Sequence, residues 1–233
     1  MSERPPIVSL HVTGPLACFS RPEFSVERTS YPWITPSAAR ALFEAVLWKP
    51  RIRYEVREIQ VLRPIRYISL RRNEIGTKVS TRGLGPEKWI LTDEQRQQRN
   101  TMALVEVGYL IKAEIYLNPE LKPTDADDNH DKYVSMFERR LAKGQHFHQP
   151  YLGCREFAAD VRPPTGEERP MPISMQHGLM LYDFRFPTSP DKHRDWRPKQ
   201  VPRPLYFDAN LTDGVVLVPS WMEVLSRLPE ALR

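Results

Sequence analysis

Residues Lys132–Phe157, KYVSMFERRLAKGQHFHQPYLGCREF, contain the strongest local signals of this chain. The stretch opens with apolar side chains at helical spacing, which predicts a short amphipathic helix with a basic outer face. These side chains are Tyr133, Met136, Phe137 and Leu141. Asp131 is the predicted N-cap, and Gly144 is the predicted left-handed stop. A chemically rich helix that runs directly into the predicted strand Tyr151–Val161 favours a site that handles phosphate groups.

Working outward from this stretch, periodicity and turn residues predict further elements on both sides. A helix should begin at Thr35-Pro36 and end before Pro50, and the strand after it should carry a β-bulge following Glu58. The other predicted elements are strands at Ile7–Phe19, Arg51–Val61 and Val105–Ile115, a basic hairpin at Tyr67–Trp89, short strands at Leu179–Phe186, Leu205–Ala209 and Val215–Val218, a hairpin turn at Thr212–Gly214 and a closing helix at Trp221–Leu228.

The order of these elements predicts an α+β fold. Strand, helix, strand, inserted hairpin, strand, helix, strand is the order of a ferredoxin-like (RRM-like) domain. We therefore expect such a domain over residues 1–163, with the hairpin insertion at about 67–100, and a small antiparallel β domain over 164–233. Because ferredoxin-like sheets host many functions, this order alone assigns none.

Composition narrows the class of protein. The 233 residues are 40% hydrophobic and 27% charged, which is typical of a globular protein, and no apolar run is long enough to span a membrane. Two cysteines, Cys18 and Cys154, are too few for a disulfide scaffold or a four-ligand zinc site, so we expect a reducing cytoplasm. His146 and His148 lack a third ligand, so we expect no metal and no cofactor.

Charge is distributed unevenly along the chain. Residues 49–99 contain 13 Lys/Arg and 6 Asp/Glu, whereas the whole chain has a net charge of only +5. A local basic surplus is typical of a surface that binds a polyanion such as nucleic acid. A solvated basic face that maintains solubility is the alternative.

Several segments of the chain resemble a known family. They are Ala45–Pro50 (AVLWKP), Arg63–Ile65 (RPI), Asp131–Tyr133 (DKY), Phe137–Arg140 (FERR), Lys143–Gln145 (KGQ), Tyr151–Phe157 (YLGCREF), Leu181–Phe184 (LYDF) and Gly214–Val216 (GVV). In this order and spacing they resemble the CRISPR-associated Cas protein five family, in its subtype I-C form, within the RAMP superfamily. The resemblance covers nearly the full length of the chain.

The resemblance implies an activity and partners. A member of this family cleaves precursor CRISPR RNA within the repeat without a metal, then stays on the 5′ handle of the mature CRISPR RNA. It does so inside the Cascade surveillance complex, beside the backbone subunit of the Cas-seven family and the large subunit of the Cas-eight family. Duplex DNA is a further partner that the sequence leaves open.

Metal-independent cleavage requires a base for the 2′-OH, an acid for the 5′-oxygen and a cation for the phosphate. In many members of the family a tyrosine, a lysine and a histidine supply these groups. The resemblance places the lysine at Lys132, the histidine at Tyr133 and the tyrosine at Leu47. Tyr133 is either a core residue or a site residue, and His130 or His148 are the candidate substitute bases.

Basic side chains are the candidate RNA contacts, with a solvated surface as the alternative. They are Arg51, Arg53 and Arg57 on one strand, Arg71, Arg72, Lys78 and Arg82 on the hairpin, and Arg139, Arg140 and Lys143 on the second helix. Tyr31, Trp48 and Trp89 are candidate stacking platforms, although we expect Trp48 to be buried.

Two other functions remain open at this point. A structural subunit would bind the handle while another enzyme cuts, which would explain why two of the three catalytic positions differ from the family pattern. An unrelated nucleic-acid-binding module fits the charge but not the order of the motifs.

Overall fold

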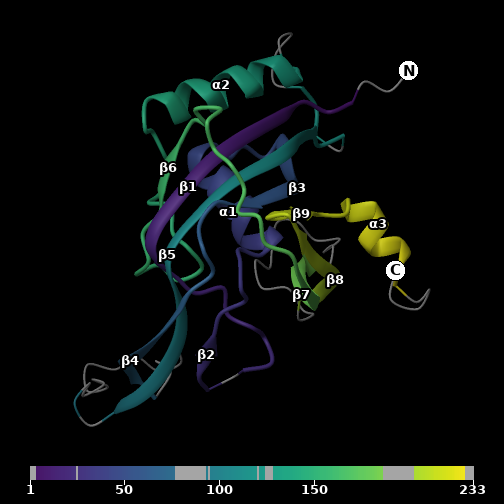
Figure 1. Cartoon of the computed structure of the whole chain (residues 1–233). Helices are drawn as coiled ribbons and strands as arrows, with labels where there is room; N and C mark the ends of the chain where they lie inside the picture. The colour runs from purple at the N-terminus through teal and green to yellow at the C-terminus, as the bar shows by residue number, and fades with distance from the viewer. Residues whose placement is uncertain are drawn as a thin grey trace.

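A computed structural model describes residues 4–24, 26–76, 93, 95–119, 121–123, 128–185 and 202–228. The described chain is an α+β protein built on a mostly antiparallel sheet of nine strands, in which seven strands follow the order β6-β1-β5-β3-β9-β8-β7, and β2 and β4 also pair with β5 (Figure 1). The strands are β1 (Ile7–Ala17), β2 (Arg28–Thr29), β3 (Ile52–Val61), β4 (Tyr67–Ile75), β5 (Arg96–Leu117), β6 (Asp160–Arg162), β7 (Met175–Arg185), β8 (Arg203–Thr212) and β9 (Val215–Leu217).

The strand β5 organises the sheet, because β1 and β3 pair with it antiparallel on its two sides. Alternating side chains of these strands are buried, and Leu10, Ile59 and Ile111 are fully enclosed. The bulge predicted after Glu58 is present one step earlier, as a shift in the β3–β5 register between Val56 and Glu58. It lets Val56 and Ile59, three positions apart, both face the core.

Two helices, α1 (Pro36–Val46) and α2 (His130–Ala142), pack beside each other against the sheet. The hydroxyl of Thr35 accepts a hydrogen bond from the backbone of Ala38 at 3.3 Å, which confirms the predicted start of α1. The rings of Phe43 and Phe137 stack with their centroids 5.6 Å apart, and the ring centroid of Tyr54 on β3 lies 6.0 Å from that of Phe137. This aromatic cluster fixes α2 against α1 and β3.

The predicted strand Tyr151–Val161 is wrong for most of its length. Residues 151–158 form a compact loop closed by a single bridge between Tyr151 and Ala158, and only Asp160–Arg162 pairs, as β6. Gly153 explains the difference, because it adopts φ +82° and a Cβ there would lie 2.0 Å from the carbonyl oxygen of Cys18. The segment Tyr151–Phe157 is therefore a turn that packs against the end of β1.

A two-stranded ribbon of β4 and the first half of β5 projects away from the helices (Figure 1). Its first strand begins where the predicted basic hairpin Tyr67–Trp89 begins, but its second strand starts at Arg96, beyond the predicted end, with Tyr67 opposite Leu104 and Ile75 opposite Arg96. Lys78, Arg82 and Trp89 lie outside the described residues.

The C-terminal strands β7, β8 and β9 form antiparallel pairs, and β9 joins them to β3. Asp213 (φ 47°) and Gly214 (φ 75°) form the predicted hairpin turn. The short helix α3 (Trp221–Ser226) follows, with a capping box between Ser220 and Glu223. Within the described ranges, no helix has the length and apolar character needed to cross a membrane.

Candidate functional site

The start of α2 is attached to the core through a buried acid. The hydroxyl of Tyr133 donates to Asp128 Oδ1 at 2.9 Å, and Arg51 Nε lies 3.5 Å from Asp128 Oδ2. Tyr133 is 4% exposed, and the side chain of Asp128 is fully enclosed. Because a buried carboxylate requires charged or hydrogen-bonding partners, this triad holds the first turn of α2 beside the start of β3.

Arg51 also binds the backbone at the end of β5. Its guanidinium donates to the carbonyl oxygens of Asn118 and Leu121, and its side chain is only 13% exposed. The guanidinium that we predicted to contact RNA is thus engaged inside the protein.

Lys132 lies in the first turn of α2, as predicted, but the cap differs from the prediction. The N-cap is Asn129, whose Oδ1 accepts from the backbone N–H of Lys132 at 3.0 Å, so the predicted cap Asp131 is wrong. The helix therefore begins at His130. Lys132 is half-buried in the first turn, where the backbone N–H groups of the helix start attract anions. Its position suits the binding of a phosphate.

The two candidate histidines lie at opposite ends of α2. His130 is the first helical residue and is half-buried, whereas His148 is exposed in the loop that follows the helix. Between Lys132 and Lys143 the helix rises roughly 16 Å, at 1.5 Å per residue. Only His130 therefore belongs to the same end of the helix as Lys132.

Leu47, which the family resemblance places at the tyrosine position, is the buried C-cap of α1. The last carbonyls of α1 receive donors from distant segments: Phe147 N–H to Ala45 at 2.7 Å, Arg140 Nε to Val46 at 2.6 Å and Tyr54 OH to Leu47 at 2.9 Å. These bonds satisfy the helix end and fix the segments on either side of it. Arg140 therefore acts inside the protein as a cap.

Two aromatic side chains project beside this capped helix end. Trp48 is 57% exposed, which corrects our expectation that it is buried, and Phe147 is 83% exposed. Sequence reasoning missed Phe147. Its two histidine neighbours were the available signal, and in the structure it lies outside any helix or strand. Exposed aromatic rings near basic side chains are typical of surfaces that stack unpaired bases. Tyr31, by contrast, is 1% exposed and cannot act as a platform.

The remaining predicted RNA contacts divide into engaged and outward-facing side chains. Arg57 lies 3.5 Å from Glu114, and Arg72 bonds both Glu74 and Glu156. The outward-facing side chains are Arg53, which is 55% exposed and 2.6 Å from Glu55, and the exposed residues Arg71, Arg139 and Lys143.

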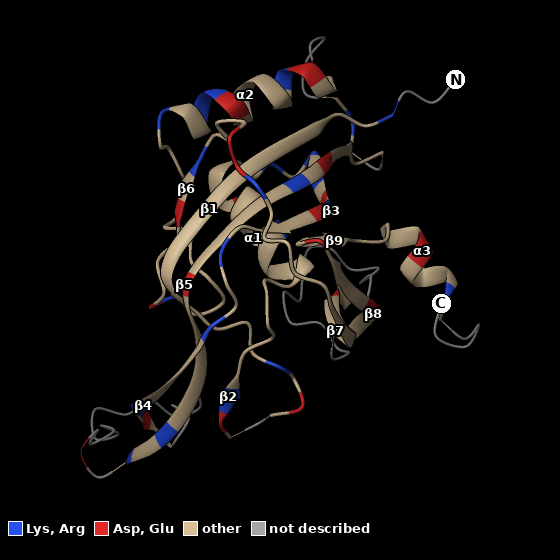
Figure 2. Ribbon diagram, viewed as in Figure 1, with Lys and Arg blue, Asp and Glu red and all other residues tan. Residues whose placement is uncertain are grey.

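Figure 2 shows both basic and acidic residues along α2. Within residues 49–99, Arg53, Arg57 and Arg72 each pair with a glutamate, so acidic partners neutralise part of the local basic surplus. Among the residues that the structure describes, no three His, Cys, Asp or Glu side chains gather as a set that could hold a metal.

Comparison with known proteins assigns the family. A family model described as CRISPR-associated protein (Cas_Cas5) matches residues 7–214. The chain is 43% identical to a Thermus thermophilus protein and 36% identical to a Mannheimia succiniciproducens protein, both named CRISPR pre-crRNA endoribonuclease Cas5d. The first alignment covers 91% of each chain, and the second covers 91% of this chain and 94% of its relative.

A crystal structure described as that of a CRISPR-associated protein has a similar fold. Its TM-score is 0.65 at 21% identity, over 94% of this chain and 95% of the other. The match of the family model over most of the chain, together with two relatives of nearly full coverage, shows that this chain belongs to the CRISPR-associated Cas5 family.

Proposed function

We propose that this chain cleaves precursor CRISPR RNA within the repeat and then remains bound to the 5′ handle of the product. The observation that carries this proposal is the 43% identity, over 91% of both chains, to a relative named CRISPR pre-crRNA endoribonuclease. An identity of this size over most of both chains supports a shared fold and a shared activity.

The proposed reaction is attack of a 2′-OH on the adjacent phosphate, without a metal. Lys132 neutralises the charge that develops on the phosphate, and His130, on the same helical turn, is the general base that takes the proton of the 2′-OH. As the bond from the 2′-oxygen to phosphorus forms, the bond to the 5′-oxygen breaks and that oxygen takes a proton from solvent water, which leaves a 2′,3′-cyclic phosphate and a 5′-OH. His130 and Lys132 are two positions apart on α2, and the 2′-OH and the phosphate belong to one RNA linkage. The proposal therefore requires that the long Lys132 side chain extend past the start of the helix to the phosphate whose 2′-OH His130 contacts.

Tyr133 has a positioning role in this proposal. Its phenol proton is directed to Asp128, and its ring is buried, so it holds the first turn of α2 in place rather than reacting with RNA. Leu47 contributes no acid–base group, and its place in the family pattern is structural here.

The RNA-binding surface that we propose follows the outward-facing side chains. Trp48 and Phe147 stack unpaired bases, while Arg139 and Lys143 contact phosphates next to them. Arg53 on β3 and Arg71 on the β4–β5 ribbon extend the surface. Since phosphate contacts release counterions, binding should weaken steeply as the salt concentration rises.

The organisation and partners that we propose also follow the family. Residues 1–163 form a ferredoxin-like domain, which the order β6-β1-β5-β3 supports, and residues 164–233 form a small β domain. The protein acts in the cytoplasm as a subunit of the Cascade complex. Its neighbours there are the backbone subunit of the Cas-seven family and the large subunit of the Cas-eight family.

A second function is favoured by one specific observation. The family's tyrosine and histidine positions hold Leu47 and Tyr133, and neither offers a free acid–base group toward the surface. A non-catalytic subunit that binds the 5′ handle would need neither group.

One assay separates the two functions. Purified protein is mixed with a stem-loop repeat RNA in EDTA, and the products are resolved by length and by their 5′ ends. Cleavage that leaves a 5′-OH on the downstream fragment supports the endoribonuclease. Intact RNA together with tight binding supports the structural subunit.

A further inference from the structure

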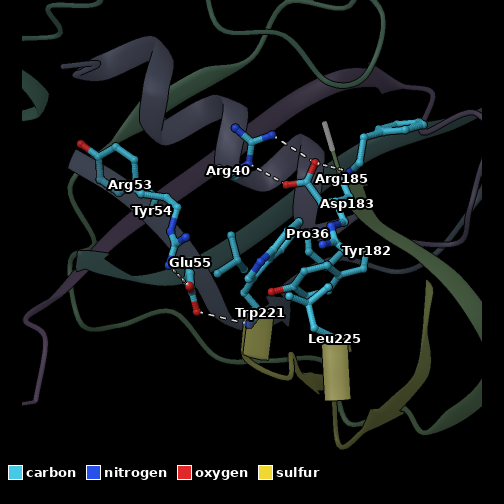
Figure 3. A pocket seen from close by; sticks show the side chains of 12 residues that line it. Pro36, Arg40, Arg53, Tyr54, Glu55, Tyr182, Asp183, Arg185, Trp221 and Leu225 are labelled. Carbon is cyan, nitrogen blue, oxygen red and sulfur yellow. Dashed lines mark hydrogen bonds and ion pairs between the residues drawn. The ribbon is translucent and has the colours of Figure 1, made fainter. Parts of the chain in front are cut away.

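A cavity of about 440 Å³ lies between α1, β3, β7 and α3 (Figure 3), and none of the residues that line it comes from α2. Its volume falls in the range typical of pockets that hold small ligands. The side chains that define it are Arg40, Arg53, Glu55, Tyr182, Asp183 and Trp221. The proposed cleavage reaction uses none of them.

Aromatic and apolar side chains form much of the wall. The rings of Tyr182 and Trp221 lie 6.0 Å apart at an interplanar angle of 39°, and Leu225 lies beside them on α3. Tyr182 is buried, whereas Trp221 is half-buried and therefore leaves part of its surface accessible. Such walls are suited to a flat aromatic ligand.

Polar groups converge on the same cavity. Glu55 is 8% exposed, and its Oε1 accepts from Arg53 at 2.6 Å. Among the described residues, the one donor to its Oε2 is the Trp221 backbone N–H, at a long 3.4 Å. A carboxylate oxygen has two lone pairs, so Oε2 retains capacity for a further donor. On the opposite side, Arg40 binds both oxygens of Asp183, at 2.8 Å and 3.2 Å, and holds that wall in place.

Arg53 gives the cavity a cationic edge. Its side chain is 55% exposed, and its guanidinium lies 5.5 Å from the Tyr116 ring centroid. A guanidinium at the mouth, an aromatic wall and a buried carboxylate inside match the parts of one nucleotide: a phosphate, a base plane and a donor on the base edge.

We propose that this cavity holds one unpaired nucleotide of the bound RNA. The base lies against Trp221, its exocyclic amino group donates to Glu55, and its phosphate contacts Arg53. The amino group restricts the base to adenine, guanine or cytosine, because uracil has none. The inference deepens the proposed function and rests on it, since it requires that this chain bind RNA.

The test uses the full chain and a set of repeat RNAs. In each RNA one unpaired nucleotide is made abasic, and the dissociation constant is compared with that of the unmodified RNA. We expect one position at which the abasic RNA binds about tenfold more weakly, the order of one lost base–aromatic stack. A repeat RNA with uracil at that position should also bind the protein more weakly than the unmodified RNA.

Protein variants connect that position to the cavity. Trp221→Ala should bind the unmodified RNA about tenfold more weakly and should no longer distinguish it from the abasic RNA. Met222→Ala, on the same helix but 72% exposed and outside the cavity lining, should retain the distinction. Leu225→Trp fills the cavity without removing an aromatic wall, and it should also abolish the difference in affinity between the unmodified and the abasic RNA. Thermal melts check that each variant is folded.

The outcomes are distinguishable. If the wild-type protein binds RNA but no abasic position is coupled to Trp221 or Leu225, the inference is overturned and the proposed function stands. If the wild-type protein binds no repeat RNA, the proposed function fails and this inference fails with it.

Discussion

The phenolic hydroxyl of Tyr133 donates a 2.9 Å hydrogen bond to the carboxylate of Asp128, whose side chain is fully enclosed by protein. The same carboxylate lies 3.5 Å from Arg51, so one buried acid links the first turn of α2 to the start of β3. Lys132, the neighbour of Tyr133, therefore owes its position to a buried polar contact. The proposed chemistry at Lys132 depends on this contact being intact.

Tyr133→Phe should destabilise the protein. The ring remains, but Asp128 loses a donor while staying buried, which costs about 1–3 kcal/mol of unfolding free energy. Urea denaturation measures this cost, and cleavage should fall because the first turn of α2 loosens. Cleavage lost with no change in stability would contradict the positioning role and would indicate a direct part in the reaction.

Tyr116→Phe is the matched control for this variant. Its hydroxyl also donates to a carboxylate, that of Glu114 at 2.9 Å, but both side chains are partly solvated. Water can replace the lost bond, so the loss of unfolding free energy should stay below about 0.5 kcal/mol.

His130→Ala and His148→Ala should differ in their effect on cleavage. His130 shares the first turn of α2 with Lys132, whereas His148 follows the other end of the helix. Removal of the general base should slow single-turnover cleavage about 100-fold or more, and His148→Ala should change it little. The reverse ranking would move the reaction to the far end of α2.

The sequence predicted the elements of this region better than their contacts. Tyr133, Phe137 and Leu141 repeat at helical spacing, and Gly144 ends the helix at φ 62°, so α2 could be located from local pattern alone. Asp128 gave no such signal, because its partner Arg51 comes from a different element and their contact exists only in the folded chain.

Local pattern also misled the predictions at specific places. Tyr151–Phe157 has the composition of a strand, yet the close approach of Gly153 to Cys18 folds it into a turn. Trp48 follows the apolar face of α1, but the helix ends at Val46, so the side chain falls beyond that face and points to solvent. The first error arises from packing between segments distant in sequence, and the second from the position at which the helix ends.

Trp48→Ala and Phe147→Ala should weaken RNA binding without loss of stability. Both rings are exposed, so their removal creates no cavity, whereas one lost base stack corresponds to about 1–3 kcal/mol of binding free energy. Fluorescence anisotropy with labelled repeat RNA measures the change. Leu217→Ala, which removes a 73% exposed side chain from β9, is the control and should bind normally. Equal affinities for all three variants would exclude the stacking surface.

Acid should destabilise the fold through two histidines. Burial lowers the pKa of His11 and of His177 below the ordinary value of 6.5. Between those lowered values and 6.5 the unfolded chain binds more protons than the folded chain, so the unfolding free energy decreases as the pH falls through this window. Urea midpoints at pH 7.5 and 5.5 measure the effect.

Replacing both histidines checks the origin of this pH dependence. The double variant His11→Gln, His177→Gln removes the two groups, so the difference between the two midpoints should become smaller. A difference as large as in the wild-type protein would assign the pH dependence to other groups.

The central claim is that this chain cuts RNA with Lys132. In EDTA, Lys132→Ala should reduce single-turnover cleavage of a stem-loop repeat RNA at least 100-fold, because the charge of the transition state is no longer neutralised. Its RNA dissociation constant should stay within about threefold of wild type, since one phosphate contact contributes little to the total. Lys143→Ala removes a lysine side chain from the other end of α2, so it controls for the loss of one positive charge from the helix.

The most direct measurement is therefore the cleavage rate of the wild-type, Lys132→Ala and Lys143→Ala proteins on one RNA in EDTA. We predict rapid cleavage by the wild-type and Lys143→Ala proteins and cleavage at least 100-fold slower by Lys132→Ala, with all three bound to the RNA. Unchanged cleavage by Lys132→Ala, or intact RNA with the wild-type protein, would contradict the claim.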